Sequence, residues 1–139
     1  MGTSSKTVSP EATFSRRKKE YRVMSANDRV TEINHLIDGL KDKYPSEINA
    51  FLVFMGKAEG NPALGMAQKE LINVALSVAA QCQWCIALHV KGAVAAGATR
   101  DEIMSAGFMA VLMHGGPALM YLVSLTEAVN EFLPEEKHG

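Results

Sequence analysis

Apolar side chains recur at intervals of three and four residues along much of the chain after residue 25, which is the spacing of one face of an α-helix. A first stripe predicts a helix over about 28–42, which Ser25 or Asn27 can cap. A second stripe predicts a helix over about 46–59, which ends before a Gly-Asn-Pro sequence. The residues expected to face inward are Val30, Ile33, Ile37 and Leu40 in the first helix and Ile48, Phe51, Leu52 and Met55 in the second.

The chain after Glu70 is apolar around most of the helical circumference, as expected for a buried central helix. One helix is expected to begin near Met66, and another is expected to run from Cys82 to about Ala96. Periodicity does not decide whether the chain turns between them, near Gln81. We prefer a turn, because a helix N-terminus would direct its amide dipoles at the cysteines and favour their thiolate form.

A capping pattern and a glycine-proline break delimit the last two helices. Thr99 and Glu102 have the spacing of a capping box, so a helix is expected from there to about Met113. A Gly-Gly-Pro sequence then ends that helix, and a final helix is expected from Pro117 to Phe132. No segment shows a sustained two-residue alternation. The pattern therefore predicts an all-α bundle of five to six helices.

A chain of 139 residues is long enough for one domain with a modest core. We expect a flexible N-terminal tail over 1–24 and a single helical domain over 25–139. The net charge of −1 gives no reason to expect a nucleic acid or a charged membrane surface as partner. Residues 1–25 nevertheless carry six basic and two acidic side chains. We interpret the RRKK run at 16–19 as a solvated tail or helix start rather than a nucleic-acid-binding arm.

Two stretches without Asp, Glu, Lys or Arg, 71–90 and 103–126, are long enough to span a membrane. The first contains several polar side chains and the second is interrupted by Gly-Gly-Pro, so we interpret both as helices buried in protein. A single chain of this size cannot cover so much apolar helix, and a homo-oligomer is therefore expected. No signal peptide is visible, which favours a cytoplasmic protein. The methionines interpreted as core filler are Met104, Met109, Met113 and Met120.

The chain has two cysteines, Cys82 and Cys85, in a Cys-x-x-Cys arrangement. Such a pair cannot join distant parts of a fold, and it favours a cytosolic redox or metal role over an extracellular disulfide framework. On a helix, Cys85 and His89 share a face through their i,i+4 spacing, and Cys82 would belong to the same stripe. Glu70, from the preceding helix, could orient His89 or pass protons through water. A dithiol, an imidazole and a carboxylate are the parts of a thiol redox centre.

Each of these residues also has a plainer interpretation. The cysteines can be small core residues, His89 a hydrogen-bonded core histidine, and Glu70 a carboxylate on a helix surface. Their occurrence together favours redox chemistry. Trp84, between the cysteines, is expected to pack in an interface or to shield the sulfur atoms.

The acid, the cysteine pair and the histidine have the spacing Glu-x11-Cys-x-x-Cys-x3-His. This pattern resembles that of the AhpD-like alkylhydroperoxidase branch of the carboxymuconolactone decarboxylase superfamily. A His-Gly-Gly-Pro-Ala sequence at 114–118 also resembles the joint before the last helix of that family, so the resemblance covers about residues 45–133. The residues that carry the motif are Glu70, Cys82, Cys85 and His89.

The resemblance implies an all-helical fold that assembles as trimers or hexamers and reduces hydroperoxides or partner disulfides. By position, Cys85 would attack the peroxide and become a sulfenic acid, and Cys82 would donate a proton and then resolve that acid to a disulfide. His89 and Glu70 would form the proton relay. The cycle requires neither a metal nor an organic cofactor, and a thioredoxin-like or lipoyl-bearing partner would supply the reductant. Trp84 stands where the best-characterised AhpD pattern has histidine.

Three other functions stay open at this point. The first is a lyase reaction on a small cyclic acid, although the decarboxylases of the superfamily generally lack the cysteine pair. The second is a metal-binding module with the same four side chains as ligands, three of which lie on one short stripe and so strain tetrahedral closure. The third is a binding or scaffold protein with an idle site, which predicts thiols no more reactive than free cysteine.

Overall fold

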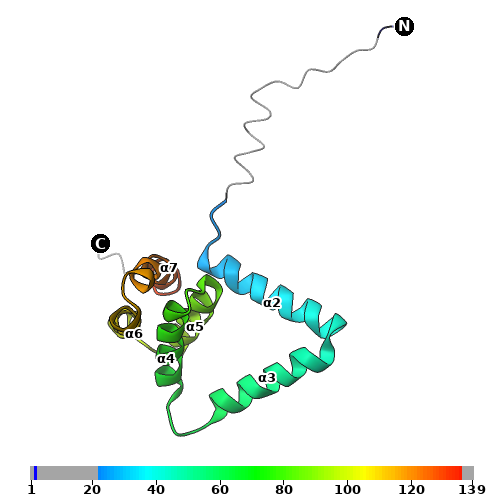
Figure 1. The fold of residues 1–139 in the computed structure, drawn as a ribbon, viewed down its shortest axis with the longest axis horizontal. Helices are drawn as coiled ribbons and strands as arrows, with labels where there is room; N and C mark the ends of the chain where they lie inside the picture. Colours follow the sequence, from blue (N-terminus) through cyan, green and yellow to red (C-terminus); the bar gives the residue numbers. More distant parts are fainter. Residues whose placement is uncertain (1, 3–21, 136–139) are drawn as a thin grey trace.

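The computed structural model describes residue 2 and residues 22–135, and the described part of the chain contains six α-helices and no strand (Figure 1). The prediction of an all-α fold with five to six helices is therefore confirmed. The basic run at 16–19 and most of the expected N-terminal tail lie outside the described residues. The helices are α2 (Ala26–Lys43), α3 (Pro45–Gly60), α4 (Met66–Ala79), α5 (Gln83–Ala95), α6 (Arg100–His114) and α7 (Gly116–Phe132).

Local side-chain chemistry sets several of the helix ends. Ser25 and Asp28 form a capping box at the start of α2, and Thr99 and Glu102 form the expected one at the start of α6. The backbone N–H of Ser25 donates to the Asp28 carboxylate, which lowers the pKa of Asp28 and keeps this cap charged. The expected turn between α4 and α5 is present at Gln81, whose φ of +56° is left-handed.

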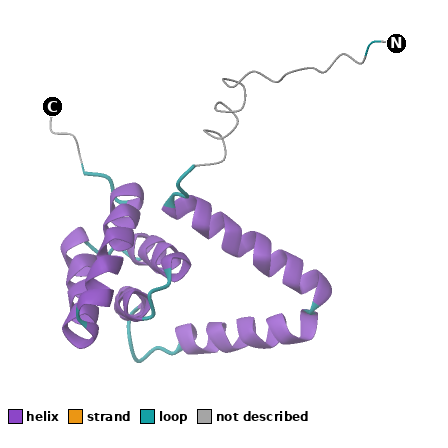
Figure 2. Ribbon diagram, turned by 45° about the horizontal axis from the view of Figure 1, so that its top comes forward, coloured by secondary structure: helices purple, strands orange, loops and turns teal. Residues whose placement is uncertain are grey.

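Helices α4 to α7 pack together around the core (Figure 2). Each contributes at least one large side chain that is fully buried, so the two uncharged stretches expected to be buried are packed in protein on one face and exposed on the other. No helix among the described residues is long and apolar enough to cross a membrane. The largest fully buried side chains are Val74 and Val78 in α4, Ile86 and Val90 in α5, Ile103 in α6, and Leu125 and Val129 in α7.

Helices α2 and α3 form an arm that leaves this body and returns to it (Figures 1 and 2). The start of α2 is held on α7 because the Glu131 carboxylate accepts hydrogen bonds from the backbone N–H groups of Ala26 and Asn27, at 2.8 and 3.1 Å. At the other end, the Lys69 ammonium donates to the carbonyl oxygens of Glu59 and Asn61 and so ties the end of α3 to α4. The arm is therefore fixed at both ends.

The outer part of the arm is less buried than predicted, and of the expected inward-facing positions only Phe51 is exposed. No residue of α3 is buried, and Phe51 is 55% exposed. In α2, Val30 is buried as expected, whereas the later positions of its stripe are only half-buried. Periodicity correctly identified the apolar faces of α2 and α3, but the other described helices cover these faces only in part. The positions concerned are Ile33, Ile37 and Leu40 in α2 and Ile48, Leu52 and Met55 in α3, all half-buried.

The interpretation of the methionines as core filler is also wrong for three of the four. Met104 packs against the core, but Met109, Met113 and Met120 are more than half exposed. These three lie on the outer faces of α6 and α7, which are exposed although they also carry uncharged residues. An uncharged helix can therefore be only half covered by its own chain.

Gly107 permits the close approach of α6 to α7, and its replacement by alanine tests this packing. An added Cβ would overlap Leu125 Cδ2 and would lie 3.0 Å from Leu122 Cδ2, both on α7. Because Leu125 is fully buried, we expect Gly107→Ala to lower the free energy of unfolding by about 1–3 kcal/mol in urea titrations.

The control for this experiment is Gly39→Ala, in the interior of α2, where an added Cβ meets nothing within 4 Å. We expect this variant to be as stable as the parent or more stable by about 0.5–1 kcal/mol, because alanine favours the helix. Equal stability of the two variants would show that the packing of α6 on α7 does not require a glycine at position 107.

Candidate functional site

Helices α4 and α5 bring an acid and an imidazole together. Glu70 lies in the first half of α4 and His89 in the middle of α5, and His89 Nδ1 is 2.9 Å from Glu70 Oε2. The two side chains are 12% and 19% exposed, respectively, so the contact is largely screened from solvent. Glu70 thus points at α5 rather than outward. A buried carboxylate in this position fixes the orientation of the ring and favours the Nδ1–H tautomer.

The two cysteines lie at the start of α5 and are joined to each other in a disulfide. Cys82 is the N-cap residue, with extended backbone, and its sulfur accepts a hydrogen bond from the backbone N–H of Cys85 at 3.2 Å. Cys82 therefore precedes the helical turns, and the prediction that it shares the helical stripe of Cys85 and His89 is wrong. Cys85 is inside the first turn of α5, so its i,i+4 relation to His89 holds.

The N-terminus of α5 is a favourable place for a thiolate. A helix start carries unpaired N–H groups and the positive end of the helix dipole, which attract negative charge. The expected turn at Gln81 ends α4 and lets a new helix begin at the cysteines. The hydrogen bond from Cys85 N–H to the Cys82 sulfur shows that an amide of this turn already points at a sulfur atom.

Gly92 is a part of the site that the sequence analysis missed. A Cβ added to this residue would lie 2.7 Å from Glu70 Cδ and 2.8 and 2.9 Å from the two carboxylate oxygens. The absent side chain therefore creates the space that the Glu70 carboxylate occupies beside His89. The sequence did contain an indication of this role. A glycine inside a helix is unfavourable, and one that lies one turn after a candidate site residue indicates that another group approaches the helix closely there.

Trp84 connects the cysteine segment to the arm. Its indole N–H donates to the Glu32 carboxylate of α2 at 2.8 Å, and the residue is 44% exposed. A cleft of about 530 Å³ lies between α2 and α5 at this contact. Sequence reasoning missed Glu32, because it is 52 positions away and nothing in the local pattern connects it to the cysteines. The cleft is lined by Glu32, Ile33, His35, Leu36 and Trp84.

The structure does not support the proposed set of four metal ligands. Within the described residues, no group of three or more histidine, cysteine, aspartate or glutamate side chains has a geometry that could hold a metal ion. Among the four candidates, Cys82 and Cys85 form a covalent pair, and Glu70 and His89 form a hydrogen-bonded pair.

Comparisons with known proteins place the chain among helical proteins of one family. The model of the carboxymuconolactone decarboxylase family matches residues 47–128. An uncharacterized protein from Cupriavidus necator is 37% identical over 93 residues, which are 67% of this chain and 82% of that protein. Uncharacterized protein 4 in the cox locus of Paracoccus denitrificans is 43% identical over 70 residues, which are 50% of this chain and 63% of that protein.

A solved structure is also similar. It is the apo form of a carboxymuconolactone decarboxylase family protein from Legionella pneumophila, with a TM-score of 0.74 and 34% sequence identity. The match covers 79% of this chain and 97% of that one. The similarity therefore extends over nearly all of the compared structure.

Replacing Gly92 by alanine tests whether the space beside His89 holds the acid in place. We expect Gly92→Ala to displace the Glu70 carboxylate, to break its hydrogen bond to His89 Nδ1, and to lower the free energy of unfolding by about 1–3 kcal/mol. Nitrogen-15 NMR of the imidazole ring and urea titration measure the two effects. A variant whose His89 Nδ1 signal matches the parent would show that Gly92 does not shape the pair.

Proposed function

This chain belongs to the carboxymuconolactone decarboxylase family, and on that premise we propose that it is a thiol oxidoreductase that reduces hydroperoxides or a partner's disulfide. One observation carries the proposal. The helix that begins at the cysteine pair also holds a histidine, one turn beyond Cys85, and the Nδ1 atom of this histidine is 2.9 Å from a largely buried carboxylate. A base next to a thiol, oriented by a third group, is the arrangement that activates a cysteine nucleophile.

The first step is removal of the thiol proton in the reduced protein. With Nδ1–H donating to Glu70, the Nε2 atom of His89 is the basic nitrogen. Cys85 is one helical turn before His89, on the same side of α5, so Nε2 takes the Cys85 proton. The amides at the start of α5 stabilise the thiolate that forms.

The second step is attack of the Cys85 thiolate on the hydroperoxide. The sulfur forms a bond to the terminal oxygen, the O–O bond breaks, and the product alkoxide takes the proton held by His89 to leave as an alcohol. Sulfur is oxidised by two electrons to the sulfenic acid, and the peroxide is reduced by two. Cys82 then attacks the sulfenic sulfur, and water leaves as the disulfide forms.

The third step restores the dithiol. An external dithiol attacks the disulfide, passes through a mixed disulfide, and leaves as a disulfide itself, so that two electrons and two protons return to the cysteines. A thioredoxin-like or lipoyl-bearing partner in the cytoplasm supplies this chemistry. For a disulfide substrate, the same thiolate attacks sulfur instead of oxygen, and the partner's disulfide is reduced.

A lyase reaction on a small cyclic acid is the second candidate, favoured by the family to which the chain belongs. Such a reaction uses the imidazole and the carboxylate for proton transfer and leaves the cysteines unchanged. The redox function requires Cys82 and Cys85, whereas the lyase function does not. Variants at these positions therefore distinguish the two functions.

Serine variants of the two cysteines test the redox cycle. We expect the reduced parent to consume one hydroperoxide for each Cys82–Cys85 disulfide formed. Cys82→Ser should stop at a sulfenic acid on Cys85, and Cys85→Ser should lose about 100-fold or more in the rate of oxidation, because the activated thiol is gone. Stopped-flow kinetics gives the rates, and mass spectrometry after trapping of sulfenic acid identifies the oxidised residue.

The double variant, with both cysteines replaced, is the control. A lyase would keep most of its rate in this variant, whereas the redox cycle would lose all of it. Oxidation of the parent no faster than that of free cysteine, or faster oxidation at Cys82 than at Cys85, would contradict the proposed roles.

A further inference from the structure

The cleft between α2 and α5 lies beside the cysteine pair. Trp84, which lines this α2–α5 cleft, stands between Cys82 and Cys85 in the chain, and its Cα atom is about 3.8 Å from that of Cys85. Both cysteines are half-buried rather than sealed in the core. A small molecule that contacts the indole can therefore bring a reactive oxygen or sulfur atom to the Cys85 sulfur.

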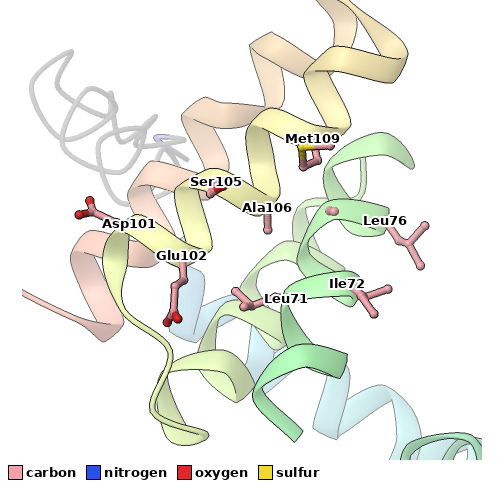
Figure 3. A pocket seen from close by; sticks show the side chains of 9 residues that line it. Leu71, Ile72, Leu76, Asp101, Glu102, Ser105, Ala106 and Met109 are labelled. Carbon is pink, nitrogen blue, oxygen red and sulfur yellow. The ribbon is translucent and has the colours of Figure 1, made fainter. Parts of the chain in front are cut away.

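A second hollow, the groove between α4 and α6, is larger but does not involve the cysteines (Figure 3). Its volume is about 630 Å³, and its lining side chains all come from α4 and α6. No residue of α5 is among them. Of these two hollows, it is therefore the α2–α5 cleft that includes a residue of the cysteine segment.

The α2–α5 cleft has the size and the lining of a site for a small molecule. Its volume is about 530 Å³, and small-molecule sites are mostly apolar with a few placed polar groups. Ile33, Leu36 and Trp84 supply apolar walls, and Leu36 and Trp84 are 62% and 44% exposed. Glu32 and His35 supply the polar groups. The cleft therefore suits a short carbon chain that ends in a polar or charged group.

Glu32 is the one acidic residue among the described residues that line the cleft, and its carboxylate is held in place. The Trp84 indole N–H donates to Glu32 Oε2 at 2.8 Å. Within the described part of the chain, no basic side chain forms an ion pair with Glu32. Arg29, one turn earlier on α2, is buried and does not line the cleft. The exposed carboxylate therefore has lone pairs free for a further donor.

We propose that Glu32 sets the charge preference of the thiol site, so that the α2–α5 cleft favours reactants with a cationic group and disfavours those with an anionic one. The inference rests on the proposed function, because it names the class of disulfide or hydroperoxide that the dithiol meets. An ammonium group on such a reactant donates to Glu32, while its carbon chain lies against Leu36 and Trp84. A carboxylate in the same place is repelled. An amine-bearing reactant is therefore preferred to an acid-bearing one.

Three small disulfides of matched length test this preference on the reduced protein. Cystamine carries two ammonium groups, 2-hydroxyethyl disulfide is uncharged, and 3,3′-dithiodipropionate carries two carboxylates. In each case the Cys85 thiolate attacks one sulfur, the S–S bond of the probe breaks, and half of the probe leaves as a thiolate. Cys82 then displaces the other half, so that the probe gains two electrons and the protein forms its disulfide.

The measured quantity is the ratio of the second-order rate constants for cystamine and dithiodipropionate, at pH 8, where histidine is ordinarily neutral. We expect Glu32→Gln to lower this ratio by about 10-fold, with about threefold from each probe, because the amide keeps an acceptor for the indole N–H but has no charge. The rate constant for the uncharged probe should change by less than about twofold. Asp38→Asn removes the same charge from α2 outside the cleft lining and should leave the ratio unchanged.

Binding to the oxidised protein gives a readout that requires no redox chemistry. Trp84 is the one tryptophan of the chain, so its fluorescence reports on the cleft. Benzylamine, benzyl alcohol and benzoate have nearly the same size and are cationic, uncharged and anionic, respectively. We expect the parent to bind benzylamine more tightly than benzoate by about 10-fold, and we expect Glu32→Gln to lower this difference to about twofold.

An unchanged rate ratio in Glu32→Gln, or an equal fall in Asp38→Asn, would overturn the role of Glu32 and leave the proposed redox function standing. Parent thiols that react with all three disulfides no faster than free cysteine would instead contradict the redox function. The fluorescence titrations decide the charge preference in either case, because equal affinity of the parent for benzylamine and benzoate would overturn it.

Discussion

The hydrogen bond between Glu70 and His89 is the interaction on which the site depends, because it connects two helices that the local sequence forms independently. The core of α4 and α5 brings the two helices together, and Gly92 leaves the space in which the carboxylate reaches the ring. Because Nδ1 of the ring is engaged with Glu70, Nε2 is the nitrogen that stays available for another partner. In the proposed redox cycle, this contact orients the base that serves the dithiol at the start of α5.

Much of the fold could be predicted from the sequence, because the signals involved are local. The capping boxes, the Gly-Gly-Pro break and the 3.6-residue period predicted five to six helices with nearly correct ends. The error over α3 has a different cause. Periodicity identifies an apolar face such as that of Phe51, but it does not say whether the same chain or another copy covers it. The exposed methionines of α6 have the same explanation.

The site could be predicted in part. The spacing of Cys85 and His89 survives in the structure because both lie within one helix. Cys82 could not be placed on that helix with certainty from its spacing, because the exact first residue of a helix depends on cap geometry. The contact of Glu32 with Trp84 could not be predicted from the sequence, because it depends on the packing of α2 against α5. The family explains the fold, but the chemistry depends on these individual side chains.

A double-mutant cycle between Glu70 and His89 tests the central claim most directly, with the second-order rate constant for oxidation of the reduced dithiol by a hydroperoxide as the readout. The account predicts that Glu70→Gln slows this reaction by about 10- to 100-fold in the parent and has no further effect in a His89→Asn background, because the acid acts only through the ring. Equal slowing by Glu70→Gln in both backgrounds, or none in either, would contradict it.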